Sequence, residues 1–366
     1  AMALVMQTLP LERRTFGLGA MAAAAEAGGL VGPIWGGGIA QVLGWRGVFW
    51  INIPLCLPIA FMMLRQSRLI DRPQSRRVDF AGAALLGVAL VFLTVALTDD
   101  PVARRPDGLT AALYAGAAIA FAAFLLRQFR AHHPLVDLSI FRKLPISAGI
   151  FTNGLVGGAL IVAMVTLPLF TNVVLLGSAI EGGLNLMRLT VALPIGALLG
   201  GYTGPRLGLS RVGALAMLLA GGGFLLMSRW DASPAFLTFS VPLFIAGLGL
   251  GLIIAPVNSS VLEHVAETER ATVSSLLTVM RLIGALVGVG LLTTRGLGGF
   301  YAQAGLIPLD DPSYVDHVKT LEIGAFHDTF LAAAIVCFAT IIPALLLRPP
   351  ATTSNTGGPD RNGLLL

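Results

Sequence analysis

The sequence is dominated by long apolar blocks of about 18 to 25 residues, the length that an α-helix needs to cross the hydrocarbon core of a bilayer. Hydrophobic residues make up 55% of the chain and charged residues only 12%, whereas about 25% of the residues in a soluble domain are charged. The blocks do not alternate apolar and polar residues as the strands of a membrane β-barrel do. We therefore expect an all-α polytopic membrane protein with about ten full transmembrane helices and a partial one. The full spans lie at roughly 16–43, 48–64, 80–98, 109–127, 146–172, 180–203, 212–229, 234–262, 271–297 and 325–347.

The charges indicate the orientation of these spans. The chain has a net charge of +5, but its basic residues are scattered through short loops instead of lying on one face, so we expect no nucleic-acid partner. If successive loops alternate between the two sides, most of the 24 lysines and arginines share a side with Arg13 and Arg14. The positive-inside rule places that side in the cytoplasm. It also places the C-terminus there.

The first residues do not have the features of a signal peptide, because residues 1–14 contain neither a charged leader nor a cleavage site. They are typical of the end of a spanning helix that runs into a loop. We therefore expect the chain to be a fragment that lacks its true start.

The first full span combines a carboxylate, a proline and many glycines. Glycines four residues apart form one stripe on a helix, where a neighbouring helix can approach closely. Proline removes one backbone hydrogen bond and bends the helix. The pattern consists of Gly19, Gly28, Gly32, Pro33, Gly36 and Gly37. A bend beside a stripe that has no side chains suits a helix that tilts against its neighbour.

This spacing resembles the antiporter motif in the fifth helix of drug–proton antiporters of the major facilitator superfamily. The next segment, Gly44-Trp45-Arg46-Gly47-Val48-Phe49-Trp50-Ile51-Asn52-Ile53-Pro54, resembles the W-R-x-x-F-x-x-N-x-P signature of the fourteen-helix branch, the quaternary-ammonium exporter type. The two motifs are adjacent and in order. The alternative is a small-residue packing stripe without this kinship.

The resemblance covers nearly the whole chain and implies its organisation. Residues 1–64 would be the remainder of an incomplete N-terminal six-helix bundle, with the end of helix 4 and helices 5 and 6. Residues 80–127 would be a central extra helix pair, and 146–348 the C-terminal six-helix bundle. Residues 65–79 and 128–145 would be cytoplasmic linkers. The polar residues 349–366 would be a disordered cytoplasmic tail.

A weaker likeness follows the span at 180–203. The family has a cytoplasmic loop of the form G-x-x-x-D-R-x-G, which Arg206 and Gly208 match, although Pro205 stands where the family often has Asp. A repeat-built transporter is expected to carry such a loop in each half. The resemblance therefore implies that Arg206 and Gly208 belong to a cytoplasmic loop motif.

Three ionisable residues, Glu26, Arg188 and Arg281, lie inside the expected spans at similar depth. A charge at mid-bilayer costs about 2.5–3.5 kcal/mol and usually faces the protein interior or a wet cavity. In the family fold, the helices that carry these residues border the central cavity. Burial disfavours an ionised carboxylate and a nearby arginine favours it, so Glu26 is a candidate to exchange a proton and an ion pair with Arg188 or Arg281. The alternatives are a permanent ion pair that locks one state and, for Arg281, a packing role.

Other polar residues are weaker candidates. Asn153, Asn185 and Asn258 could line a substrate cavity or form helix–helix hydrogen bonds. His132 and Asp137 have the H-x-x-x-x-D spacing that acyltransferases use. Their segment, HPLVDLSIFR, is similar to a loop signature of the family, which disfavours an intramembrane acyltransferase. No metal-binding spacing and no nucleotide-binding loop occurs in the sequence.

Together these features predict a proton-coupled antiporter that exports hydrophobic or amphipathic compounds, cationic drugs or lipids, by alternating access. We expect no enzyme activity, no cofactor beyond the proton as coupling ion, and a monomer. Arg188 before ALPIGALLGG, and the segment LTTRGLGGFY, are similar to a mycobacterial subgroup of lipid and multidrug exporters. That resemblance implies triacylglycerol-type cargo, a periplasmic lipoprotein partner and the bacterial inner (plasma) membrane. The rival class is a non-transporting membrane sensor or scaffold on the same fold.

Overall fold

A computed structural model of the chain describes residues 2–67, 79–97, 106–131, 138–231, 234–292, 298–304 and 314–348. Within these ranges the regular secondary structure is helical, and nine helical segments are long and apolar enough to cross a membrane. The chain is therefore a polytopic all-α protein, as the apolar blocks predict. The block at 16–43 is helical but is not among the nine. His132, Asp137, the tail 349–366 and much of both expected linkers lie outside the described residues.

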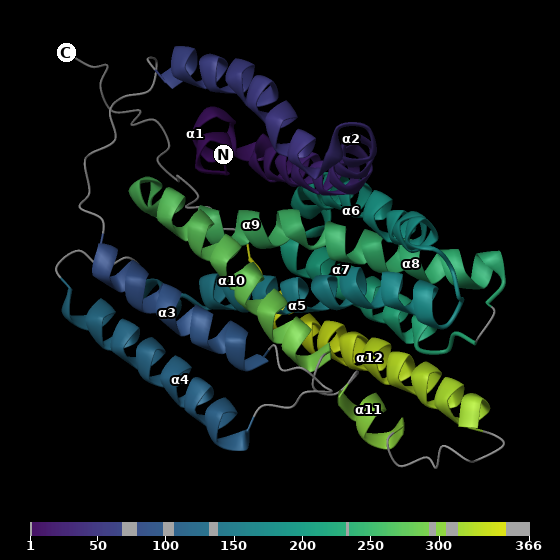
Figure 1. The fold of residues 1–366 in the computed structure, drawn as a ribbon. Coiled ribbons are helices and arrows are strands. Elements are labelled where there is room, and N and C mark those ends of the chain that lie inside the picture. The colour runs from purple at the N-terminus through teal and green to yellow at the C-terminus, as the bar shows by residue number, and fades with distance from the viewer. Residues whose placement is uncertain are drawn as a thin grey trace, which may run out of the picture.

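The N-terminal part consists of α1 (Met2–Thr8) and the long α2 (Leu11–Ser67). The backbone of α2 leaves the helical region at Gly44, whose φ of 73° is accessible to glycine without the steric cost that a side chain adds. The bend divides α2 into two arms. The first arm lies on α6 and α9. The second arm, which contains the candidate span Val42–Met62, stands apart from the bundle in Figure 1 and is almost wholly exposed.

The C-terminal helices form the body of the molecule (Figure 1). They are α5 (Leu144–Val173), α6 (Ala179–Leu207), α7 (Leu209–Met227), α8 (Phe236–Leu252), α9 (Ile254–Glu263), α10 (Arg270–Leu291), α11 (Gly298–Ala304) and α12 (Tyr314–Leu345), with short 3₁₀ turns at Leu138–Arg142 and Glu267–Glu269. Helices α8 and α9 form one membrane span that is broken at Ile253. The break follows from Pro256, which has no amide hydrogen to donate to the preceding turn.

Pairs of glycines bring the helices of this body together. On α5 and α10, Gly154 and Gly284 face each other, and a Cβ added at Gly284 would collide with the carbonyl oxygen of Gly154. The same arrangement joins α6 to α8, where a Cβ at Gly196 would lie 2.8 Å from the amide nitrogen of Leu252. Small residues at such positions allow backbones to approach in a membrane, where dispersion forces and hydrogen bonds replace the hydrophobic effect between helices.

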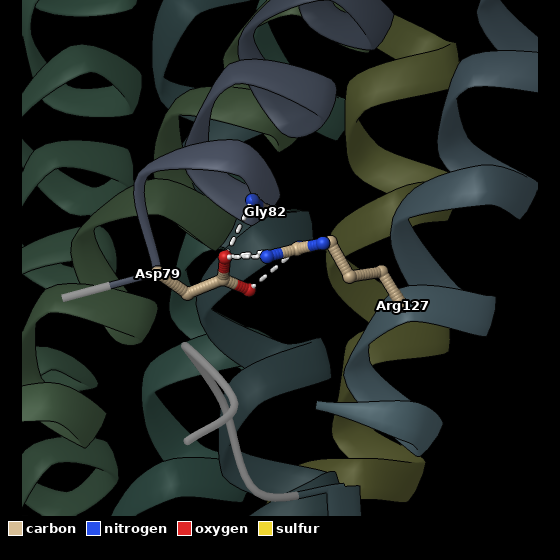
Figure 2. Close-up of polar contacts among 3 residues, drawn as sticks. All are labelled: Asp79, Gly82 and Arg127. Carbon is tan, nitrogen blue, oxygen red and sulfur yellow. Dashed lines mark hydrogen bonds and ion pairs between the residues drawn. The ribbon is translucent and has the colours of Figure 1, made fainter. Parts of the chain in front are cut away.

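Helices α3 (Phe80–Leu97) and α4 (Asp107–Arg130) lie side by side on one flank of the body and contact it through α10. Asp79 fixes the start of this pair (Figure 2). Its Oδ1 accepts hydrogen bonds from the amide of Gly82 at 3.0 Å and from Nη2 of Arg127 at 2.8 Å. The Arg127 guanidinium, followed by the Gly82 amide, holds the pKa of Asp79 below its ordinary value.

Helix α12 begins eleven residues before the expected block at 325–347. Its first turns contain Asp316, His317 and Lys319. These residues lower the local hydropathy, so the apolar pattern alone predicts a later start for the helix. Helix α10 is described to Leu291, and the rest of the expected block, residues 293–297, lies outside the described ranges.

We expect Gly284→Ala to destabilise the fold by about 1–3 kcal/mol, because the added methyl group forces α10 away from α5. Thermal unfolding of the purified chain in detergent would measure this change. Gly222→Ala on α7 is the matched control, since a Cβ there would meet no described atom within 4 Å. Equal melting temperatures of the two variants would contradict close glycine packing between α5 and α10.

The lowered pKa of Asp79 predicts a pH-dependent contribution to stability. The folded chain binds the proton less tightly than the unfolded chain, so the contribution is complete above about pH 4, the ordinary pKa of aspartate, and is lost as the pH falls below it. We therefore expect Asp79→Asn to lower the melting temperature at neutral pH and to differ less from the parent in acid. Exposed Asp231→Asn serves as the control. A difference between Asp79→Asn and the parent that does not change with pH would contradict this role.

Candidate functional site: a charge pair between two membrane helices

Glu26 of α2 and Arg281 of α10 form an ion pair inside the helical body. Nη2 of Arg281 donates to Oε1 of Glu26 at 2.7 Å. The side chain of Glu26 is 16% exposed and that of Arg281 is 26% exposed. Since α2 packs mainly on α6 and α9 while α10 packs mainly on α5, the pair joins two helices that have different principal neighbours.

Both charges lie well inside apolar helices. Arg281 lies eleven residues after the first residue of α10, which corresponds to about 16 Å along the helix axis. Unpaired charges at such a depth cost about 2.5–3.5 kcal/mol each on insertion scales. The pair offsets part of that cost, and removal of one partner would leave the other uncompensated, which in protein interiors costs about 3–5 kcal/mol.

Helix α5 packs closely against α10 at the level of Arg281. A Cβ added at Gly157 would collide with the carbonyl oxygen of Arg281 and lie 2.9 Å from its Cγ. The absence of a side chain at Gly157 therefore lets α10 approach α5 at the level of Arg281. This close packing fixes the backbone of Arg281 while its side chain reaches Glu26.

The structure distinguishes between the two arginines expected near Glu26. Arg188 on α6 is not its partner, because its guanidinium lies 4.8 Å from the ring centroid of Phe236 and 5.4 Å from that of Phe239. Of the two arginines predicted as alternative partners of Glu26, the structure therefore brings Arg281 to it. The sequence indicated that these charges lie at similar depth in the membrane, but not that the Arg188 side chain faces α8.

Only part of the glycine pattern of α2 is seen to pack on a described helix. Gly19 packs closely on α6, where an added Cβ would lie 2.9 Å from Cα of Gly201. At Gly28 and Gly32 an added Cβ would meet no described atom within 4 Å, so no described helix uses that part of the stripe. Pro33, Gly36 and Gly37 lie in α2, but their surroundings fall outside the described part of the structure.

Two of the three candidate asparagines form helix–helix hydrogen bonds. Nδ2 of Asn153 donates to the Leu277 carbonyl of α10 at 2.6 Å, and Nδ2 of Asn185 donates to Thr171 Oγ1 of α5 at 3.2 Å. These bonds favour the structural interpretation of both residues over a substrate contact. Asn258 is buried in α9, and its role as a cavity residue stays a prediction.

The predicted loop motif lies at the turn between α6 and α7. Gly208 has a φ of 93° and its amide donates to the carbonyl of Gly204 at 3.0 Å, which ends α6. The guanidinium of Arg206 lies 3.5 Å from the ring centroid of Tyr202. A side chain at position 208 would be strained, so glycine at this position has a local conformational cause.

A second polar link between α2 and the C-terminal helices was not predicted. Oγ1 of Thr15 lies 2.7 Å from Oγ of Ser259, and Ser259 donates to Oε1 of Glu263 at 2.7 Å. Thr15 and Ser259 are both buried. Ser259 and Glu263 are four residues apart, a spacing that places them on one helix face and is visible in the sequence, but the sequence does not identify Thr15 as their partner.

Comparison with known proteins finds a matching family and several relatives. Residues 1–289 match the family model described as Major Facilitator Superfamily. The chain is 35% identical over 318 residues to a triacylglyceride transporter of Mycolicibacterium hassiacum, an alignment that covers 82% of this chain and 58% of the relative. It is 32% identical over 368 residues to a triacylglyceride transporter of Mycolicibacterium smegmatis, covering 90% and 64%. It is 33% identical over 360 residues to one of Mycobacterium tuberculosis strain H37Rv, covering 90% and 68%.

The chain thus spans about three fifths of the length of the first two relatives, 58% and 64%. The family and the relatives' names indicate a transporter rather than an enzyme. They also confirm the resemblance to the mycobacterial lipid-transporter subgroup of this superfamily.

We expect Glu26→Gln and Arg281→Gln each to lower the stability of the chain, and their effects to be coupled by about 0.5–3 kcal/mol in a double-mutant cycle. The cycle of Glu26→Gln with Arg188→Gln is the control, and its effects should add within about 0.5 kcal/mol because the two residues share no contact. Chemical or thermal unfolding in detergent supplies the free energies. Coupling of Glu26 to Arg188 as strong as to Arg281 would contradict the observed pairing.

Proposed function

Because the chain belongs to the Major Facilitator Superfamily, we propose that it works in proton-coupled export of apolar lipids of the triacylglycerol class by alternating access. The observation that carries the proposal is the ion pair between Glu26 of α2 and Arg281 of α10. The relatives' names support lipid cargo. The low charge content of the spans also suits apolar cargo.

The pair supplies a direct way to link protonation to movement. Ionised Glu26 is held by Arg281, and a proton on the carboxylate removes the charge that attracts the guanidinium. The link between α2 and α10 then weakens, while Gly157 keeps Arg281 in place against α5. Loss of the proton on the other side of the membrane restores the pair. The proposal keeps the C-terminus in the cytoplasm, an orientation that the distribution of basic residues supports.

The test is export of labelled triacylglycerol from proteoliposomes under an imposed pH gradient. We expect Glu26→Gln to reduce gradient-driven export about tenfold or more, within the usual range of coupling between sites. Glu12→Gln, an exposed acid on the same helix, should leave export unchanged.

Undiminished gradient-driven export by Glu26→Gln would refute the coupling role and favour a permanent ion pair. The absence of lipid movement with a parent protein that has the full length of the relatives would instead favour a sensor or scaffold on the same fold.

A further inference from the structure

A cavity of about 310 Å³ opens between α6 and α8, away from the Glu26–Arg281 pair. Its wall consists of Met187, Arg188, Val191, Phe236, Ser240 and Phe244. Ser240 lies four residues after the first residue of α8, so the cavity is near the end of the body at which α8 begins. Its volume falls at the lower end of the range for small-molecule sites, about 300–1,000 Å³.

Arg188 brings an uncompensated positive charge to this cavity. Among the described residues no carboxylate pairs with it, and its guanidinium lies against the rings of Phe236 and Phe239. Arg281 and Arg127, which also lie inside candidate spans, each have an acidic partner. Ionisable residues within spans usually have a partner or belong to a functional site, so Arg188, which also lines a cavity, is a candidate contact for an external anion.

Ser240 adds a polar group at the same place. Its hydroxyl oxygen is shielded from solvent and has no hydrogen-bond partner among the described residues. Serine and threonine hydroxyls in helices commonly bond to the carbonyl one turn earlier, as Thr94 and Thr203 do here. Ser240 makes no such bond, so its hydroxyl has no acceptor among the described residues, and a ligand that displaces the side chains around it would supply one.

The remaining wall is apolar and partly exposed. Phe236 is 69% exposed and Phe244 is 43% exposed. A free inorganic anion would gain nothing from these side chains, whereas an acyl chain would bury them. The wall therefore selects a ligand that carries both an acidic group and a hydrocarbon chain.

We propose that the α6–α8 cavity binds an anionic phospholipid, with the phosphate on Arg188 and Ser240 and an acyl chain along Phe236, Phe244 and Val191. On the orientation proposed above, the lipid lies in the outer leaflet. The site is separate from the proton-coupling pair, so its occupancy can be measured without transport.

Native mass spectrometry of the purified full chain tests the proposal. We expect retention of phosphatidylglycerol, weaker retention of diacylglycerol, which lacks the phosphate, and no binding of inorganic phosphate. Arg188→Gln should weaken phosphatidylglycerol binding about tenfold, the scale of a lost hydrogen bond to a charged group, and Arg188→Lys should weaken it less.

Arg46→Gln is the matched control, because Arg46 also stacks on an aromatic ring, at 4.9 Å from the centroid of Trp45, but does not line the cavity. An equal loss of lipid in Arg46→Gln and Arg188→Gln would overturn the proposal, because it would show only a general charge effect. Equal binding of phosphatidylglycerol and diacylglycerol would overturn it as well.

Val191→Trp provides an independent test that keeps the arginine. The larger side chain fills the cavity, so phosphatidylglycerol binding should fall as in Arg188→Gln. Lipid retention in Val191→Trp equal to that of the parent would refute the site, including in the case that Arg188→Gln does not fold.

Discussion

The need to bury opposite charges together in an apolar medium governs how α2 meets the C-terminal helices. Neither Glu26 nor Arg281 is stable alone at its depth, and the 2.7 Å contact between them offsets part of the cost of placing each there. In the proposed function, a proton on Glu26 would remove this compensation, so the contact between α2 and α10 is the one that protonation would weaken. The same property gives the pair a structural role and a candidate role in coupling.

The glycine packing of the C-terminal helices fixes the position of the arginine in this pair. Gly154, Gly157 and Gly284 bring α5 and α10 into backbone contact, so Arg281 is carried on a closely packed support. The second arm of α2 is exposed, and an added Cβ at Gly28 or Gly32 meets no described atom. The arrangement therefore combines an arginine on a closely packed support with a carboxylate that lies two residues before Gly28, where the unpacked part of the α2 stripe begins.

The sequence predicted the helices well because the length of an apolar block follows directly from bilayer thickness. It also identified Glu26 and Arg281, since charges inside such blocks are few. It did not choose between Arg188 and Arg281, because position along a helix gives depth but not the direction in which the side chain points. That direction depends on packing, here of α10 on α5 through Gly157 and of α6 on α8 through Gly196. The link from Thr15 to Ser259 was missed for the same reason.

The central claim is that the Glu26–Arg281 contact is a releasable connection between α2 and α10. The most direct test of this claim is to measure, by double electron–electron resonance spectroscopy, the distance between spin labels at the exposed positions Val31 and Val287. The account predicts that acidification of the parent protein, or Glu26→Gln at neutral pH, shifts the distance distribution to longer and broader values. Superimposable distributions for the parent and Glu26→Gln would contradict it.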